Sequence, residues 1–194
     1  MSQALFPGWR PDADDRERLG ALAAAIEAAR PASAPPLKPR RPDQWHITLC
    51  FVGNNVEHLV TPRLRDAFAR AAERIPPHQF AIERVVYWPK AGVVVALPET
   101  SPPLQALCDA TRDALRSCSI TPEKVTTQPH VTLAYPGKYL PPQPWLDGID
   151  CSDSACSVDS FDLLFNPGGR YESLGAWALT GTGLPPPPHQ AGLF

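Results

Sequence analysis

The chain has 194 residues, a net charge of −2 and a pI of about 6.2, so it lacks the basic surface of proteins that track along nucleic acid. It has no apolar run of about 18 residues and no basic-then-apolar leader, so we expect neither a membrane-spanning helix nor a secretory signal. Five cysteines at irregular spacing predict reduced thiols in a cytoplasmic protein, not a disulfide framework or a zinc site.

The hydrophobic pattern predicts alternating strands and helices. A strand at 4–9 precedes an amphipathic helix at 12–29 with an acidic first turn. The expected elements after the Pro-rich connection at 31–44 are a strand from 46, a helix after Thr61-Pro62, a hairpin of strands at 80–88 and 93–97, a helix after Ser101-Pro102, and strands at 128–135, 158–165 and 171–180. We expect a single domain over 1–182 and a disordered Pro-rich tail over 183–194.

One short phrase occurs twice in the chain. Residues 46–53 read His-Ile-Thr-Leu-Cys-Phe-Val-Gly, and residues 130–137 read His-Val-Thr-Leu-Ala-Tyr-Pro-Gly. In a strand, side chains two positions apart share a face, so each copy presents its His and its Thr together and turns its apolar residues to the core. Packing alone would preserve the apolar residues and would not require the outward-facing pair, so the repeat indicates a functional site.

The repeat also predicts the architecture. The two copies lie about half of the ordered length apart, and the same order of strands and helices occurs around each of them. The simplest arrangement is an α+β fold with two similar lobes related by a pseudo-two-fold axis. Two antiparallel sheets would then flank a central groove, with the helices outside.

Two imidazoles and two hydroxyls around one small group suit phosphoryl chemistry. An in-line displacement at phosphorus needs a base for the entering oxygen and an acid for the leaving oxygen, and His46 and His130 would lie on opposite sides. Thr48 and Thr132 would donate hydrogen bonds to the non-bridging oxygens, where charge develops. Such a site needs no metal and no cofactor. The residues leave the order of acid and base open.

The paired phrases resemble the two motifs of the two-histidine (2H) phosphoesterases, and within them the RNA 2′,3′-cyclic phosphodiesterases, also called 2′-5′ RNA ligases. The similarity extends over about residues 4–180 and includes further segments: Leu5-Phe6 with Pro11, 41–46, Leu97-Pro98-Glu99 and 167–172. It implies a bilobal fold and metal-free hydrolysis of a terminal 2′,3′-cyclic phosphate to a 2′-phosphate, in some members with reversible 2′-5′ joining. It also implies His46 as proton donor and His130 as proton acceptor.

One position departs from the family pattern. Many such phosphodiesterases have an Arg that helps to hold phosphate at about the position of Tyr135. Lys138, the nearest basic residue downstream, either supplies this charge or is a solvated turn residue. Arg40 and Arg41 either guide an RNA end or form a solvated basic cluster. Trp45 is the better candidate for stacking on a base, because Tyr135 is expected on the core face.

The sequence is therefore compatible with three functions. The first is hydrolysis of cyclic phosphate at RNA or oligonucleotide ends. The second is the same chemistry on small nucleotides or on ADP-ribose cyclic phosphate, which the acidic pI favours. The third is a binding module for nucleotide ends without turnover, against which the intact His and Thr pairs argue. In each case we expect a monomer that binds RNA 3′ ends or nucleotides and no membrane.

Overall fold

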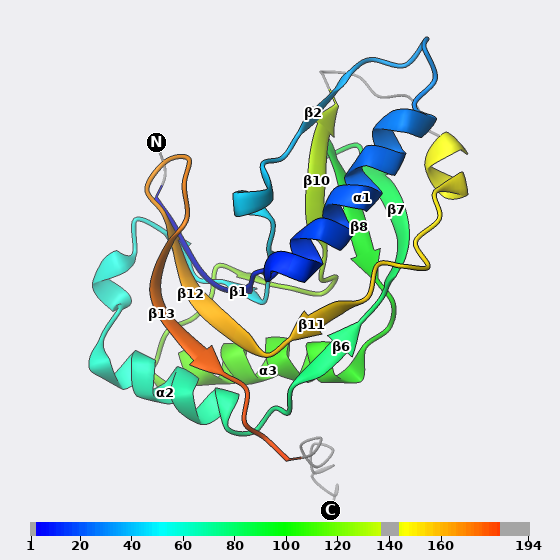
Figure 1. Cartoon of the computed structure of the whole chain (residues 1–194). Helices are drawn as coiled ribbons and strands as arrows, with labels where there is room; N and C mark the ends of the chain where they lie inside the picture. The colour runs from blue at the N-terminus through cyan, green and yellow to red at the C-terminus, as the bar shows by residue number, and fades with distance from the viewer. Residues whose placement is uncertain (1–2, 137–143, 183–194) are drawn as a thin grey trace, which may run out of the picture.

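The computed structural model describes residues 3–136 and 144–182, which fold into antiparallel sheets with three α-helices (Figure 1). Lys138 and the expected tail at 183–194 lie outside the described residues, and the expected domain boundary at 182 stays a prediction. No α-helix in the described part of the chain is long and apolar enough to cross a membrane. All five cysteines are free thiols.

Two larger sheets organise the fold. The first has the strand order β13-β12-β1-β3, with β5 also paired to β1, and the second has the order β2-β10-β8-β7. The strands of the first sheet are β1 (Ala4–Trp9), β3 (Ile47–Thr48), β5 (Gly53–Asn54), β12 (Ser160–Asn166) and β13 (Glu172–Ala178). Those of the second sheet are β2 (Leu37–Pro39), β7 (Ile82–Trp88), β8 (Val93–Pro98) and β10 (Val131–Pro136). Two short pairs, β4 (Cys50–Phe51) with β9 (Lys124–Val125) and β6 (His78–Phe80) with β11 (Cys156–Val158), complete the strands.

The helices lie on the outside of the sheets, as the sequence predicts. Helix α1 (Ala13–Ala29) crosses in front of β10 and β8, whereas α2 (Pro62–Ala72) and α3 (Pro102–Ser117) pack together below β12 and β13 (Figure 1). Each begins at a side-chain cap, because Asp12, Thr61 and Ser101 accept a hydrogen bond from the backbone N–H three residues later. Three short 3₁₀ helices are η1 (Pro42–Gln44), η2 (Glu57–Leu59) and η3 (Pro144–Gly148). The expected α+β fold with two antiparallel sheets is confirmed.

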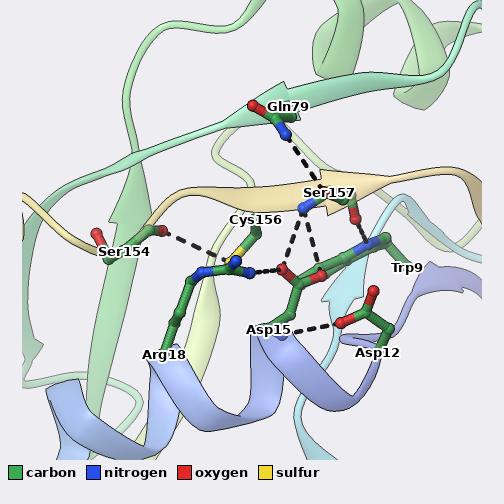
Figure 2. Close-up of polar contacts among 8 residues, drawn as sticks. All are labelled: Trp9, Asp12, Asp15, Arg18, Gln79, Ser154, Cys156 and Ser157. Atoms are coloured by element: carbon green, nitrogen blue, oxygen red, sulfur yellow. Dashed lines mark hydrogen bonds and ion pairs between the residues drawn. The ribbon is translucent and has the colours of Figure 1, made fainter.

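A buried carboxylate fixes the corner between β1 and α1 (Figure 2). Asp15 is fully buried, accepts two hydrogen bonds from the Ser157 backbone N–H at 3.2 and 3.3 Å, and pairs with Arg18 at 3.1 Å. Burial raises the pKa of this carboxyl group. The Trp9 indole N–H donates to the carbonyl oxygen of the same Ser157 at 2.8 Å. Since Trp9 pairs with Ile47, this corner also fixes the start of the first repeat.

The first repeat does not form the continuous strand that the alternation predicts. It is divided into β3, β4 and β5, because β3 and β5 pair with β1 whereas β4 turns to pair with β9. Backbone hydrogen bonds from Leu49 to Pro7 and from Val52 to Leu5 keep the segment along β1 between these pieces. The Pro-rich connection also contains a short strand, β2, which pairs with β10 and was not expected.

Candidate active site

Each repeat histidine lies directly before its strand, with its ring held in the same way. His46 Nδ1 lies 2.8 Å from the carbonyl oxygen of Gln44, and His130 Nδ1 lies 3.0 Å from that of Gln128. In a neutral ring this contact places the proton on Nδ1 and leaves the lone pair on Nε2. His78 makes the same contact with Pro76, so the bond orients a ring and does not by itself mark a catalytic residue.

The two repeats meet at one open groove of about 530 Å³. Thr48 from the first repeat and His130 from the second both line it, together with the aromatic rings of Phe51 and Trp88 and the side chain of Lys124. The Trp88 ring packs against the His130 ring in a T-shaped arrangement, with 4.4 Å between centroids. The volume is in the range of sites that hold small molecules and cofactors.

His46 does not itself line this groove and is more enclosed than His130. Its ring lies 5.1 Å from the Phe6 ring and 4.9 Å from the Tyr171 ring, centroid to centroid. Burial lowers the pKa of His46 to about 4, and the positive charges of Arg40 and His130 lower it further, against the backbone contact to Gln44, which raises it. The charge of His130 acts on His46, so the two imidazoles lie within electrostatic range of each other.

Burial also lowers the pKa of His130, and its contact with the Gln128 carbonyl partly opposes that change. Both rings are therefore mainly neutral in the free protein near pH 7. A neutral imidazole is a proton acceptor, so one of the two must gain a proton before it can act as an acid. A bound phosphate anion would favour this protonation through its charge.

Of the two threonines, the structure brings Thr48 to the lining of the groove and does not bring Thr132 there. Thr132 is half-buried on β10 opposite Val95 of β8. Within the described ranges, neither side-chain hydroxyl has a protein hydrogen-bond partner. The Thr126 hydroxyl donates to the backbone carbonyl of Thr48 at 2.9 Å and so fixes the backbone of Thr48 at the groove.

The expectation that Trp45 stacks on a base is wrong. Its side chain is 3% exposed and belongs to the hydrophobic core, where α1 passes close to the indole at Gly20. The reason is the alternation of the strand, which puts Trp45 on the face of Ile47, opposite to His46. Trp88, at the end of β7, is the tryptophan that lines the groove.

The expectation that Tyr135 faces the core is also wrong. The register of β10 against β8 shifts at a β-bulge between Thr132 and Ala134. A bulge inserts one residue and so reverses which face the following side chains take. Ala134 is buried as a result, and Tyr135 is half-buried with the Arg40 guanidinium 5.6 Å from its ring centroid.

Four residues named above were not singled out as site residues from the sequence: Trp88 beside His130, Tyr171 beside His46, and the two glutamines whose carbonyls hold the rings. Among these residues, only the two glutamines could have been found from the sequence. Gln44 and Gln128 each stand two residues before a repeat histidine, so the repeat is longer than the matched phrases.

Comparison with known proteins agrees with this arrangement. The model of the 2′-5′ RNA ligase superfamily matches residues 19–167, which include both repeats. The chain belongs to this superfamily. It is thus a member of the two-histidine phosphoesterases, and the family supports a phosphoesterase or ligase type of activity. No curated protein matches the sequence.

Solved structures extend the similarity over nearly the whole chain. Escherichia coli LigT in complex with NADP+ is 25% identical with a TM-score of 0.63, over 93% of this chain and 99% of that one. TT0787 of Thermus thermophilus is 24% identical with a TM-score of 0.70, over 93% of this chain and 100% of that one. A structure described as a phosphoesterase is 24% identical with a TM-score of 0.65, over 92% and 99% of the two chains.

Proposed function

We propose that this protein hydrolyses the terminal 2′,3′-cyclic phosphate of RNA or oligonucleotides to a 2′-phosphomonoester, with His46 and His130 as the acid–base pair. The observation that carries the proposal is the convergence of the two repeats on one groove, where His130 and Thr48 lie together and His130 influences the charge state of His46. Membership of the 2′-5′ RNA ligase superfamily supports the same chemistry.

The proposed reaction uses the two rings in opposite senses. His130 takes a proton from water through Nε2, and the water oxygen attacks phosphorus in line with the ribose 3′-oxygen. The bond from phosphorus to the 3′-oxygen breaks, and His46 donates a proton to that oxygen. The products are a 2′-phosphate and a free 3′-hydroxyl. The Thr48 and Thr132 hydroxyls donate hydrogen bonds to the non-bridging oxygens in the transition state.

Turnover of an oligonucleotide with a 2′,3′-cyclic phosphate end tests the proposal directly. We expect release of a 2′-phosphate and no 3′-phosphate, at the same rate with and without a strong chelator, because imidazoles alone move the protons. Phosphorus NMR of the product distinguishes the two monoesters. Loss of turnover in chelator with recovery on adding a divalent cation would refute the metal-free mechanism. Tight binding of the cyclic end without turnover would instead favour a binding module.

Substrate size separates the first two functions considered. The groove volume of about 530 Å³ holds a nucleotide, and the acidic pI favours short substrates. We expect kcat/KM to rise from a 2′,3′-cyclic mononucleotide to a cyclic-ended trinucleotide if RNA ends are the substrate. Equal values, or a higher value for ADP-ribose cyclic phosphate, would favour the small-nucleotide alternative.

The pH dependence of kcat/KM should be bell-shaped with its maximum below pH 6.5. In the free protein the pKa of His46 is lowered to about 4 and that of His130 is lowered from 6.5. The reaction needs one protonated and one neutral ring, so kcat/KM falls above the higher pKa and below the lower one. The bound phosphate anion raises both pKa values, so the maximum of kcat should lie at higher pH than that of kcat/KM. A kcat/KM maximum at or above pH 7 would contradict this reading.

A further inference from the structure

Arg40 lies between the two repeats and is attached to both. Its backbone N–H donates to the Leu133 carbonyl oxygen in the second repeat at 2.8 Å. Its side-chain Nε donates at 3.2 Å to the Gln44 carbonyl oxygen, which is also the acceptor that holds the His46 ring. The structure therefore places the Arg40 side chain beside His46 of the first repeat and attaches the Arg40 backbone to the strand of the second repeat.

Two tyrosines hold the guanidinium in place. Arg40 Nη2 donates to the Tyr171 hydroxyl at 2.6 Å, and the guanidinium carbon lies 5.6 and 5.9 Å from the ring centroids of Tyr135 and Tyr171. These partners are neutral, so they fix the position of the cation without neutralising it. The N–H groups of Nη1 have no hydrogen-bond partner in the described ranges 3–136 and 144–182.

The charge of Arg40 is not balanced by a carboxylate. Its neighbour Arg41 pairs with Asp43 at 3.2 Å, whereas no Asp or Glu of the described segments forms an ion pair with Arg40. The charge is close enough to His46 to lower the pKa of that ring. A half-buried guanidinium without a counter-ion, next to the neutral His46 imidazole, makes this part of the site a place for an anion.

We propose that Arg40 binds the phosphate group of the substrate, and that Tyr135 and Tyr171 are positioning residues for its guanidinium. This inference rests on the proposed function. The proposal also accounts for the absence of an Arg at position 135. The positive charge comes instead from Arg40, which follows β2 in the Pro-rich connection that pairs with β10. Tyr135, in the place where many relatives have an Arg, supplies the ring on which Arg40 lies.

Two Arg40 variants separate anion binding from a structural role. Arg40→Gln removes the charge but keeps an N–H donor near the place of Nε, which donates to the Gln44 carbonyl oxygen, and Arg40→Lys keeps the charge but loses the forked donors. We expect Arg40→Gln to lower both the affinity for inorganic phosphate, measured by calorimetry, and kcat/KM by about 10- to 100-fold. Arg40→Lys should lower both quantities by a smaller factor. A structural role predicts the opposite order or equal losses. Arg41→Ala is the matched control and should stay within about twofold, since Arg41 is an exposed side chain already paired with Asp43.

Two further measurements complete the test. The double variant Arg40→Gln/Tyr135→Arg returns a guanidinium to the same place from β10, and we expect it to recover phosphate affinity relative to Arg40→Gln. Removing the Arg40 charge should also raise the pKa of His46, which moves the acidic limb of kcat/KM to higher pH. Unchanged phosphate affinity in a folded Arg40→Gln protein would overturn the inference. Wild-type protein that binds phosphate through Arg40 but hydrolyses no cyclic phosphate would overturn the proposed function instead.

Discussion

Replacing either repeat histidine with alanine should lower kcat for cyclic phosphate hydrolysis by at least about 10²-fold, because a positioned general acid or base typically contributes that much. The two rings are held alike by backbone carbonyls, at 2.8 Å for His46 and 3.0 Å for His130, so each is preorganised for proton transfer through Nε2. Steady-state kinetics on a cyclic-ended oligonucleotide measures the effect. Thr48→Ala should cost less than either change, because other donors to the phosphate remain.

The chain offers a matched control for these variants. His78 makes the same contact between Nδ1 and a carbonyl oxygen two residues earlier, and burial lowers its pKa as well, but it lies on β6, away from the groove. His78→Ala should leave kcat within about twofold once the protein is shown to be folded. If His46→Ala and His130→Ala retain wild-type kcat, the assignment of the site to these residues is wrong.

The parts of the fold that depend on local chemistry could be predicted from the sequence. The three helix starts at Asp12, Thr61 and Ser101 are side-chain caps, which act on backbone groups within one turn. The α+β fold with two antiparallel sheets followed from the order of elements and from the repeat. The candidate histidines stood out because the same polar pair occurs twice on strand-forming sequence.

The parts that depend on distant partners could not be predicted. The bulge that turns Tyr135 away from the core forms only where β10 pairs with β8, a strand that lies well before it in the chain. The place of Arg40 depends on its backbone bond to Leu133, which exists only because the Pro-rich connection forms a strand beside the second repeat. Pro-rich sequence favours extended backbone but does not name the strand with which it pairs.

The family resemblance and the electrostatic surroundings of His46 favour opposite orders of acid and base. The family resemblance assigns His46 as the donor, but its pKa of about 4 in the free protein favours the neutral ring that a base requires. The family assignment therefore requires that bound phosphate, held beside Arg40, raises the pKa of His46 enough to protonate it. For this reason the roles must be separated by a substrate and not by the pH profile, which reports the two pKa values without naming their owners.

A nucleoside 2′-phosphodiester with p-nitrophenol in place of the ribose 3′-oxygen makes this separation. The aryl oxide leaves without a proton, so loss of the acid should matter little and loss of the base should still matter. We expect His46→Ala to approach the wild-type rate on this substrate and His130→Ala to remain at least about 10²-fold slow, as followed by absorbance of the released nitrophenolate. If His130→Ala regains the wild-type rate on this substrate and His46→Ala stays slow, the assignment is reversed. His46 would then be the base, in agreement with its lowered pKa.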